Sequence, residues 1–206
     1  MKFKKKIILI GTEEDMIFEL KNANYDLAGY FGNKKKHSLK YLGKITQISN
    51  YLKKNSKVKI CIAMGPLNIR KILLKKYKKN ILTYVSKNSI ISKLTKVSTG
   101  SFIQNSCFIG NNSKIGEACK INVGAKIHHN STIGSFSDIA PNSTILGNVK
   151  IGNECYIGAG TTVREKVKIS NNIMTGINSA VVKNLNKSGL YIGIPAKKIK
   201  DSYERP

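Results

Sequence analysis

Aliphatic β-branched residues recur at every sixth position through the second half of the chain. Counting in sixes from Val85 to Val181, each site is Ile or Val except Thr175. A second set of mostly small residues, such as Cys107 and Ser113, falls four positions later. No α-helix has a period of six, and plain strand alternation would not keep one residue type at every sixth site. The pattern predicts a hexapeptide β-solenoid, which buries one aliphatic and one small side chain per repeat.

The solenoid interpretation also accounts for the turns and the cysteines. Asn and Gly crowd the intervening positions, as expected of turns that need positive φ. Triangular coils of about 18 residues would give residues 83–182 roughly five to six coils. Cys61, Cys107, Cys119 and Cys155 show no metal-ligand spacing, so we expect no metal site. Cys119 and Cys155 would lie two coils apart, roughly 10 Å, and should be free thiols.

The first eighty residues show a different, alternating pattern. Short apolar stretches at 5–12, 25–31 and 57–65 alternate with helical stretches at 13–24, 45–55 and 67–80. This order predicts a small Rossmann-like parallel sheet with covering helices. Ligands bind such sheets at the carboxyl ends of the strands, here the loops after Ile10 and Met64. The fingerprint G-x-G-x-x-G is absent from "GTEEDM", so a nicotinamide enzyme is not expected.

The net charge of +25 raises the question of a nucleic-acid partner. The lysines are spread along the chain rather than clustered, so we expect anionic small molecules and no nucleic acid as partners. The apolar run after the N-terminal lysines is too short for a signal peptide. No stretch reaches the roughly 18 to 20 apolar residues of a membrane span. We therefore expect a cytoplasmic protein without membrane insertion.

Two stretches of the repeat, "IGNNSKIGEACK" and "IGNECYIGAGTT", resemble the left-handed β-helix of the trimeric hexapeptide acyltransferases. Together with the N-terminal region, the chain resembles bacterial sugar-nucleotide acetyltransferases, including the UDP-bacillosamine-pathway N-acetyltransferase and the sialic acid O-acetyltransferases. The likeness is strongest in "IHHNSTIGSFSDIAPNSTILGNVKIGNECYIG" and "GIPAKKI". It implies a nucleotide-sugar-binding domain at 1–82, an acetyltransferase β-helix at 83–184 and a tail at 185–206 near the coenzyme A (CoA) site.

Two histidines in the repeat are the candidate catalytic groups. An amine that attacks a thioester must lose a proton near neutral pH, where imidazole titrates. The resemblance assigns this role to His129, with His128 as the alternative. One coil further on lies Gly147, whose N–H is suited to hold an oxyanion. Where the family commonly has a carboxylate after the histidine, this chain has Asn130.

The resemblance also implies the ligands and their residues. The cosubstrate would be acetyl-CoA, without a metal, and the assembly a homotrimer with clefts between subunits. Acetyl-CoA would contact Gly147, Ala159, Ile177 and the basic tail at Lys197 and Lys198. The acceptor would contact Gly11, Gly65, Arg70, Asn122, His128 and Asp138.

The expected activity is N-acetylation of the amino group of a nucleotide-linked amino or aminodeoxy sugar for surface glycans. O-acetylation of a sugar hydroxyl is the nearest enzymatic alternative. A catalytically silent hexapeptide scaffold is the non-enzymatic alternative. The "GTEEDM" loop favours this alternative, whereas the spacing of one coil between His129 and Gly147 disfavours it. A basic nucleic-acid-binding module is the last alternative.

Overall fold

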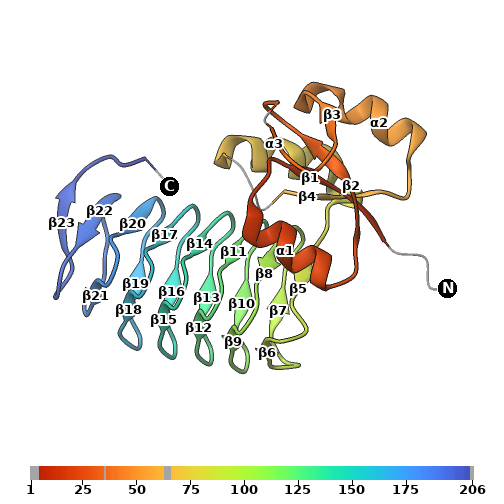
Figure 1. The fold of residues 1–206 in the computed structure, drawn as a ribbon. Coiled ribbons are helices and arrows are strands. Elements are labelled where there is room, and N and C mark those ends of the chain that lie inside the picture. Colours follow the sequence, from red (N-terminus) through yellow and green to blue (C-terminus); the bar gives the residue numbers. More distant parts are fainter. Residues whose placement is uncertain (1–4, 35, 63–65, 205–206) are drawn as a thin grey trace. The chain divides into compact units, whose positions relative to one another are not determined.

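The computed structural model describes residues 5–34, 36–62 and 66–204. The chain divides into two compact units, Met1–Thr83 and Tyr84–Pro206. Each unit has its own hydrophobic core. Figure 1 shows the course of the chain through both units.

The first unit is a four-stranded parallel sheet with the order β3-β2-β1-β4. The sequence predicted three of these strands and the three helical stretches, but not the three-residue β3, which follows a polar, lysine-rich segment. The elements are β1 (Lys6–Ile10), α1 (Glu14–Asn22), β2 (Asp26–Phe31), β3 (Tyr41–Gly43), η1 (Ile45–Gln47), α2 (Ile48–Lys54), β4 (Lys59–Cys61), α3 (Leu67–Tyr77) and η2 (Lys78–Asn80).

The apolar run of β1 is continuous because a parallel strand in the middle of a sheet is covered on both faces. Ile7 to Ile10 are all buried. Helix α1 buries Met16, Ile17 and Leu20, which follow helical spacing. These contacts make the core of the first unit and fix the carboxyl edge of β1 and β2.

The second unit is a left-handed parallel β-helix with three sheets. The eight-stranded sheet contains β5 (Tyr84–Val85), β8 (Phe102–Ile103), β11 (Lys120–Ile121), β14 (Asp138–Ile139), β17 (Tyr156–Ile157), β20 (Ile173–Thr175), β22 (Gly189–Ile192) and β23 (Lys197–Lys200). The six-stranded sheet contains β6 (Ile90–Ile91), β9 (Phe108–Ile109), β12 (Lys126–Ile127), β15 (Thr144–Ile145), β18 (Thr162–Val163) and β21 (Ala180–Val181). The five-stranded sheet contains β7 (Lys96–Val97), β10 (Lys114–Ile115), β13 (Thr132–Ile133), β16 (Lys150–Ile151) and β19 (Lys168–Ile169).

Residues from 185 onward extend the eight-stranded sheet. Strand β22 pairs parallel to β20, and β23 turns back antiparallel to β22. The C-terminal segment thus packs on the last coils of the β-helix (Figure 1).

Neighbouring coils pair with an offset of 18 residues, so that Ile115 lies beside Ile133 and Ile127 beside Ile145. The N–H after each inward aliphatic residue donates to the next coil, as from Gly110 to the Ile127 carbonyl at 2.8 Å. The predicted aliphatic column is buried from Ile103 to Val181, whereas Val85 in the first coil is 40% exposed. The core of this unit is therefore one continuous aliphatic stack.

The small inward residues form a second column whose polar atoms are hydrogen-bonded between coils. Ser113 Oγ donates to the His128 carbonyl at 3.0 Å. Ser131 Oγ donates to the Leu146 carbonyl at 2.9 Å. Cys119 and Cys155 occupy the same column, and both are buried free thiols. This polar inner column is stable because most of its groups find a carbonyl one coil on, the exception being the buried Ser179 Oγ near the end of the column.

The turns require the left-handed backbone conformation once in every repeat. Every sixth residue from Gly100 to Asn178 has φ between 50° and 81°, and Asn and Gly predominate among them. Asn tolerates this conformation better than most residues because its short amide hydrogen-bonds locally. Asn130, directly after the paired histidines, is one of these positions.

Thr175, the exception in the aliphatic column, replaces a backbone acceptor. In other coils the corresponding N–H donates to a carbonyl, as from Gly152 to Ile169 at 2.8 Å. Here Gly158 N–H donates instead to Thr175 Oγ1 at 2.9 Å. The Thr175 side chain is fully buried. The hydroxyl is therefore needed at this site to satisfy a buried donor.

We expect Thr175→Val to lower the free energy of unfolding by about 1–3 kcal/mol, because it leaves the Gly158 N–H buried without an acceptor. Urea denaturation of the two proteins would measure the difference. Val163→Thr, in the same column, is the control for the cost of a hydroxyl where the backbone bonds are already made. Equal stability of Thr175→Val and the native chain would contradict this role.

Candidate functional site

The paired histidines lie in the turn between β12 of the six-stranded sheet and β13 of the five-stranded sheet. Coils on both sides hold its backbone. Asn130 N–H donates to the Asn111 carbonyl at 2.8 Å, and Asn148 N–H donates to the His129 carbonyl at 2.9 Å. The His129 side chain is exposed, whereas His128 is half-buried. The turn thus presents one imidazole to solvent from a rigid backbone.

Gly147 lies one coil after His129 and in contact with its ring. A Cβ on Gly147 would lie 2.7 Å from both Cε1 and Nε2 of His129, so any larger residue would force the imidazole to move from this position. Gly147 itself is buried. In the described part of the chain no group accepts its N–H, whereas the Ser135 N–H of another turn donates to Asn153 Oδ1 at 2.8 Å. The structure therefore brings an exposed imidazole beside a backbone donor.

Asn130 contacts the other ring nitrogen of His129. Its Nδ2 lies 3.0 Å from His129 Nδ1. With the amide in this orientation Nδ1 accepts, and the neutral ring carries its proton on Nε2. Turning the amide by about 180° would present Oδ1 to an Nδ1–H and leave the Nε2 lone pair available. The orientation of the Asn130 amide thus decides which ring nitrogen can act as a base.

A cleft of about 390 Å³ opens at the two histidines. It extends toward the preceding coils and is lined by Ile90 and Phe108 together with both imidazoles. The Phe108 and His128 rings lie 5.7 Å apart between centroids, with 58° between their planes. His128 is therefore part of the wall of the cleft.

The residues predicted for acetyl-CoA lie on later coils and on the C-terminal strands. Ala159 is half-buried, and Ile177, one coil on, is 73% exposed. Lys197 and Lys198 belong to β23. Lys198 Nζ forms an ion pair with Asp201, and this hydrogen bond lowers the pKa of the Asp201 carboxyl.

Two further residues that were predicted to contact the acceptor substrate lie together at the eight-stranded sheet. Asn122 Nδ2 donates to the carbonyl of Ile139 at 2.8 Å. Asp138 is buried and pairs in register with Lys120 of the preceding coil. Burial lowers the pKa of the Lys120 ammonium, and the negative charge of Asp138 partly offsets this shift. Asp138 is thus positioned next to a cation on its own sheet.

The first unit has a pocket of about 680 Å³ at the carboxyl edge of its sheet. Gly11 follows β1, Gly32 and Lys34 follow β2, and Lys44 and Pro66 complete the wall. The pocket lies where a parallel sheet binds ligands, and its ionisable lining groups among the described residues include two lysines.

Gly65 and Arg70 are the other residues of the first unit that were predicted to contact the acceptor substrate. Gly65 and the loop start at Met64 lie outside the described residues. Arg70 is 4% exposed on α3, and the described lining of the pocket includes Ile69 of that helix but not Arg70.

Glu14, an acidic residue of the unusual "GTEEDM" segment, points toward His37. Glu14 Oε1 lies 2.7 Å from His37 Nε2. Because the Leu39 N–H donates to His37 Nδ1 at 2.9 Å, the neutral ring carries its proton on Nε2 and donates it to Glu14. The Glu14 carboxylate is thus held against a neighbouring loop.

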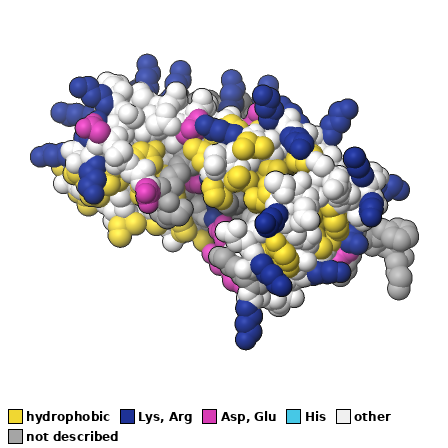
Figure 2. All heavy atoms as spheres, turned by 90° about the horizontal axis from the view of Figure 1, so that it is seen from above, with side chains coloured by type: hydrophobic (Ala, Val, Ile, Leu, Met, Phe, Trp, Pro, Cys, Tyr) yellow, Lys and Arg dark blue, Asp and Glu magenta, His cyan; other side chains and the backbone are white. Residues whose placement is uncertain are grey.

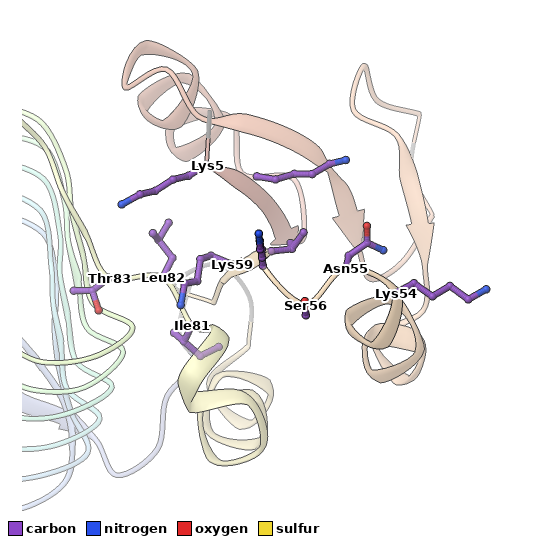
Figure 3. Close-up of a pocket in the computed structure, with 11 residues that line it drawn as sticks. Lys5, Lys54, Asn55, Ser56, Lys59, Ile81, Leu82 and Thr83 are labelled. Carbon is purple, nitrogen blue, oxygen red and sulfur yellow. The ribbon is translucent and has the colours of Figure 1, made fainter. Parts of the chain in front are cut away.

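A second hollow in the first unit, of about 730 Å³, lies at the opposite, amino edge of β1 and β4. Figure 3 shows that Lys5 and Lys54 in its wall point away from each other. Asn55 there caps the C-terminus of α2, where the helix dipole disfavours an anion. Divergent cations beside a helix C-terminus make a poor phosphate site. The lysines in its wall are Lys5, Lys6, Lys54, Lys57 and Lys59.

The basic side chains are scattered over the surface. Figure 2 shows Lys and Arg spread across the visible face, interspersed with uncharged surface. Among the described residues, no group of three or more His, Cys, Asp and Glu side chains could hold a metal ion. None of the described helices combines the length and apolarity needed to cross a membrane.

Sequence reasoning did not identify the apolar wall beside the histidines. The signal was present in the 18-residue spacing, because Ile90 and Phe108 pair in register on adjacent coils and Gly110 lies 18 positions before His128. The six-residue period marks inward positions, whereas the outward neighbours of the histidine turn follow only from the 18-residue offset between coils.

The sequence and structure were compared with known proteins. The family model described as bacterial transferase hexapeptide (six repeats) matches residues 112–147 and 139–165. These matches include the histidine turn and Gly147. Comparison of the sequence with curated proteins gives no significant match.

Solved structures resemble nearly the whole chain. The acetyltransferase domain of PglB from Neisseria gonorrhoeae FA1090, in complex with acetyl coenzyme A, has a TM-score of 0.85 at 18% identity, covering 95% of this chain and 100% of the other. A histidine-to-alanine mutant of GDP-perosamine N-acetyl transferase from Caulobacter crescentus, in complex with CoA and GDP-perosamine, has a TM-score of 0.84 at 22% identity, covering 97% and 98%. WeeI from Acinetobacter baumannii AYE has a TM-score of 0.76 at 19% identity, covering 95% and 100%. The coils that carry the histidine turn therefore match bacterial transferase hexapeptide repeats, and the chain has the fold of these solved structures, two of which are described as acetyltransferases.

Proposed function

We propose that this protein transfers the acetyl group of acetyl-CoA to the amino group of a nucleotide-linked amino sugar. The observation that carries the proposal is the contact of the exposed His129 imidazole with Gly147 of the next coil. The fold adds support, because proteins that share it are described with bound acetyl coenzyme A or with CoA and GDP-perosamine. The description of the latter protein as an N-acetyl transferase supports an N-linked product.

His129 would act as the general base. The amine attacks the thioester carbonyl carbon and becomes positively charged, so a proton must leave as the new C–N bond forms. His129 Nε2 faces Gly147 and can accept this proton when the Asn130 amide presents Oδ1 to Nδ1–H. Collapse of the intermediate then breaks the C–S bond, and the proton can pass to the departing thiolate of CoA.

Gly147 N–H would stabilise the oxyanion of the tetrahedral intermediate. A preorganised backbone donor costs no reorganisation when charge develops on the carbonyl oxygen. The absence of an acceptor for this N–H among the described residues supports the assignment. Glycine also has a steric reason to be here, since any Cβ would displace the base.

Acetyl-CoA would lie along the coils that follow His129, toward Ala159, Ile177 and the basic strand β23. The 73% exposure of Ile177 supports a partner for this surface. A single coil face is too short to enclose an extended pantetheine chain. We therefore propose a homotrimer in which neighbouring subunits close the cosubstrate clefts.

The nucleotide would bind the first unit at the carboxyl edge of its sheet. The pocket of about 680 Å³ there and its lysines Lys34 and Lys44 support this placement. A ligand pocket of this size suits a nucleotide, since small-molecule sites usually span about 300–1,000 Å³. Glu14 keeps its negative charge in the hydrogen bond from the neutral His37 ring, but it is not part of the described lining of this pocket.

We expect His129→Ala to lower kcat with GDP-perosamine by at least about a hundredfold, because it removes the general base. The trimer and the affinity for acetyl-CoA should be retained, since the side chain is exposed. His128→Ala is the matched control and should cost much less. Steady-state kinetics and isothermal titration with acetyl-CoA would measure both. Near-normal turnover of His129→Ala would refute the assignment.

A substitution cycle would test the contact between His129 and Gly147 without any assay of activity. Gly147→Ala should lower the unfolding midpoint slightly in the native background, because the exposed imidazole must leave its present packing to avoid a methyl group at 2.7 Å. In the His129→Ala background the same substitution should cost clearly less. Identical losses in the two backgrounds would show that the ring does not pack there.

Replacing Asn130 by Asp should shift the acidic limb of the kcat/KM profile to higher pH. A carboxylate accepts Nδ1–H and favours the charged imidazolium, so a higher pH is needed to free the base. Asp also tolerates the left-handed backbone at this position. Asn130→Gly is the control, because it keeps the backbone and removes the polar group. An unchanged acidic limb in Asn130→Asp would contradict the role of Asn130.

A further inference from the structure

One sheet of the β-helix carries a column of lysines on its outer face. In the five-stranded sheet, whose strands stack from β7 to β19 (Figure 1), the residue before each inward aliphatic side chain pairs in register with its counterpart on the next coil. The residues of this lysine column are Lys96, Lys114, Thr132, Lys150 and Lys168. The matching positions of the other two sheets, from Tyr84 to Ala180, hold one lysine each, Lys120 and Lys126.

The lysine column places like charges side by side. All four lysines are exposed. Lys96 pairs with Lys114, and Lys150 pairs with Lys168, at a strand spacing of about 4.8 Å. Like charges directly opposite each other on neighbouring strands destabilise a sheet. None of the ion pairs between described residues includes any of these lysines, so the column presents its positive charge to the solvent.

The turns at the two borders of the five-stranded sheet carry opposite charge. The border with the six-stranded sheet holds the histidine turn and one acid, Glu165. The basic residues of this border, between β6 and β19, are Lys93, Arg164 and Lys166. The border with the eight-stranded sheet holds two acids, Glu117 and Glu154, and its turns from 98 to 172 contain no Lys or Arg. The positive potential of the column therefore extends toward the histidine turn.

The histidine turn lies at the middle of the lysine column. Thr132, which interrupts the column, follows His129 on the same coil. Lys114 lies one coil before Thr132, and Lys150 lies one coil after it. The four lysines together span roughly 19 Å at the ~4.8 Å spacing of neighbouring strands. An anion drawn to any part of the column is thereby brought close to the candidate base.

We propose that the lysine column attracts phosphate-bearing ligands and guides them to the histidine turn. The inference rests on the proposed function, since acetyl-CoA and a nucleotide-linked sugar both carry several phosphate charges. Electrostatic guidance raises association rates by about 10- to 1,000-fold and weakens as salt is added. The lysines act through their field rather than by holding the bound ligand, because exposed ion pairs contribute little binding energy. The cleft at the histidines contains none of the four side chains.

Stopped-flow measurement of CoA association tests this guidance without turnover. The probe is a fluorescent CoA analogue. The column variant carries Lys96→Gln, Lys114→Gln, Lys150→Gln and Lys168→Gln. Its association rate constant should be about tenfold lower than that of the native chain at low ionic strength, with an unchanged dissociation rate constant. The two association rates should converge at about 1 M salt, where the Debye length falls to about 3 Å.

A second variant controls for net charge. It removes the same number of exposed lysines from the helices of the first unit, by Lys21→Gln, Lys53→Gln, Lys54→Gln and Lys75→Gln. Its association rate with the CoA analogue should stay close to the native value. The column variant should unfold at no lower a temperature than the native chain, because it loses pairs of like charges.

Three results would overturn the inference. They are an unchanged association rate in the column variant, an equal loss in the control variant, and a loss that appears in the dissociation rate constant instead. If association depends on the column but no nucleotide-linked amino sugar is acetylated, the proposed function fails and the guidance stands. If acetylation occurs and association is independent of the column, the guidance fails alone. Absence of CoA binding to the native chain would refute both.

Discussion

The hydrogen bonding of each coil to the next fixes everything else in the β-helix. Because the offset is constant, a residue and its partner 18 positions later always lie beside each other, as Ile127 and Ile145 do. This register turns a linear sequence into columns. It stacks the aliphatic core, aligns the inner serines with carbonyls, and brings His129 onto Gly147. The register that packs the core therefore also places the candidate catalytic groups beside each other.

Much of the fold could be predicted because the repeat has few alternatives. A six-residue period of Ile and Val has no helical solution, so the strands and inward faces followed directly. In the first unit, β1 and α1 were recognisable by their apolar runs and spacing. Strand β3 was not, because three residues of mixed polarity such as Tyr41–Gly43 carry no period, and only pairing with β2 makes them a strand.

The site was predictable to the extent that it depends on the repeat. The contact of His129 with Gly147 follows from coil arithmetic, and the structure adds how closely the ring packs. The partner of Glu14 could not be found in this way, because His37 reaches it from a loop without regular spacing. Thr175 illustrates the same limit: its deviation was visible, but its reason, a buried N–H of Gly158, required the coordinates.

The left-handed turn residues have a consequence for how such a chain can change in length. Between Gly100 and Asn178 a residue with positive φ occurs at every sixth position without exception. A single inserted or deleted residue inside this stretch that is not looped out at a turn would move polar residues into the aliphatic column of every later coil. Whole coils can be added without disturbing the columns, and one added after Gly147 would leave the histidine turn and its neighbour intact. Such a chain can therefore lengthen its β-helix by tandem duplication while the contact between His129 and Gly147 stays unaltered.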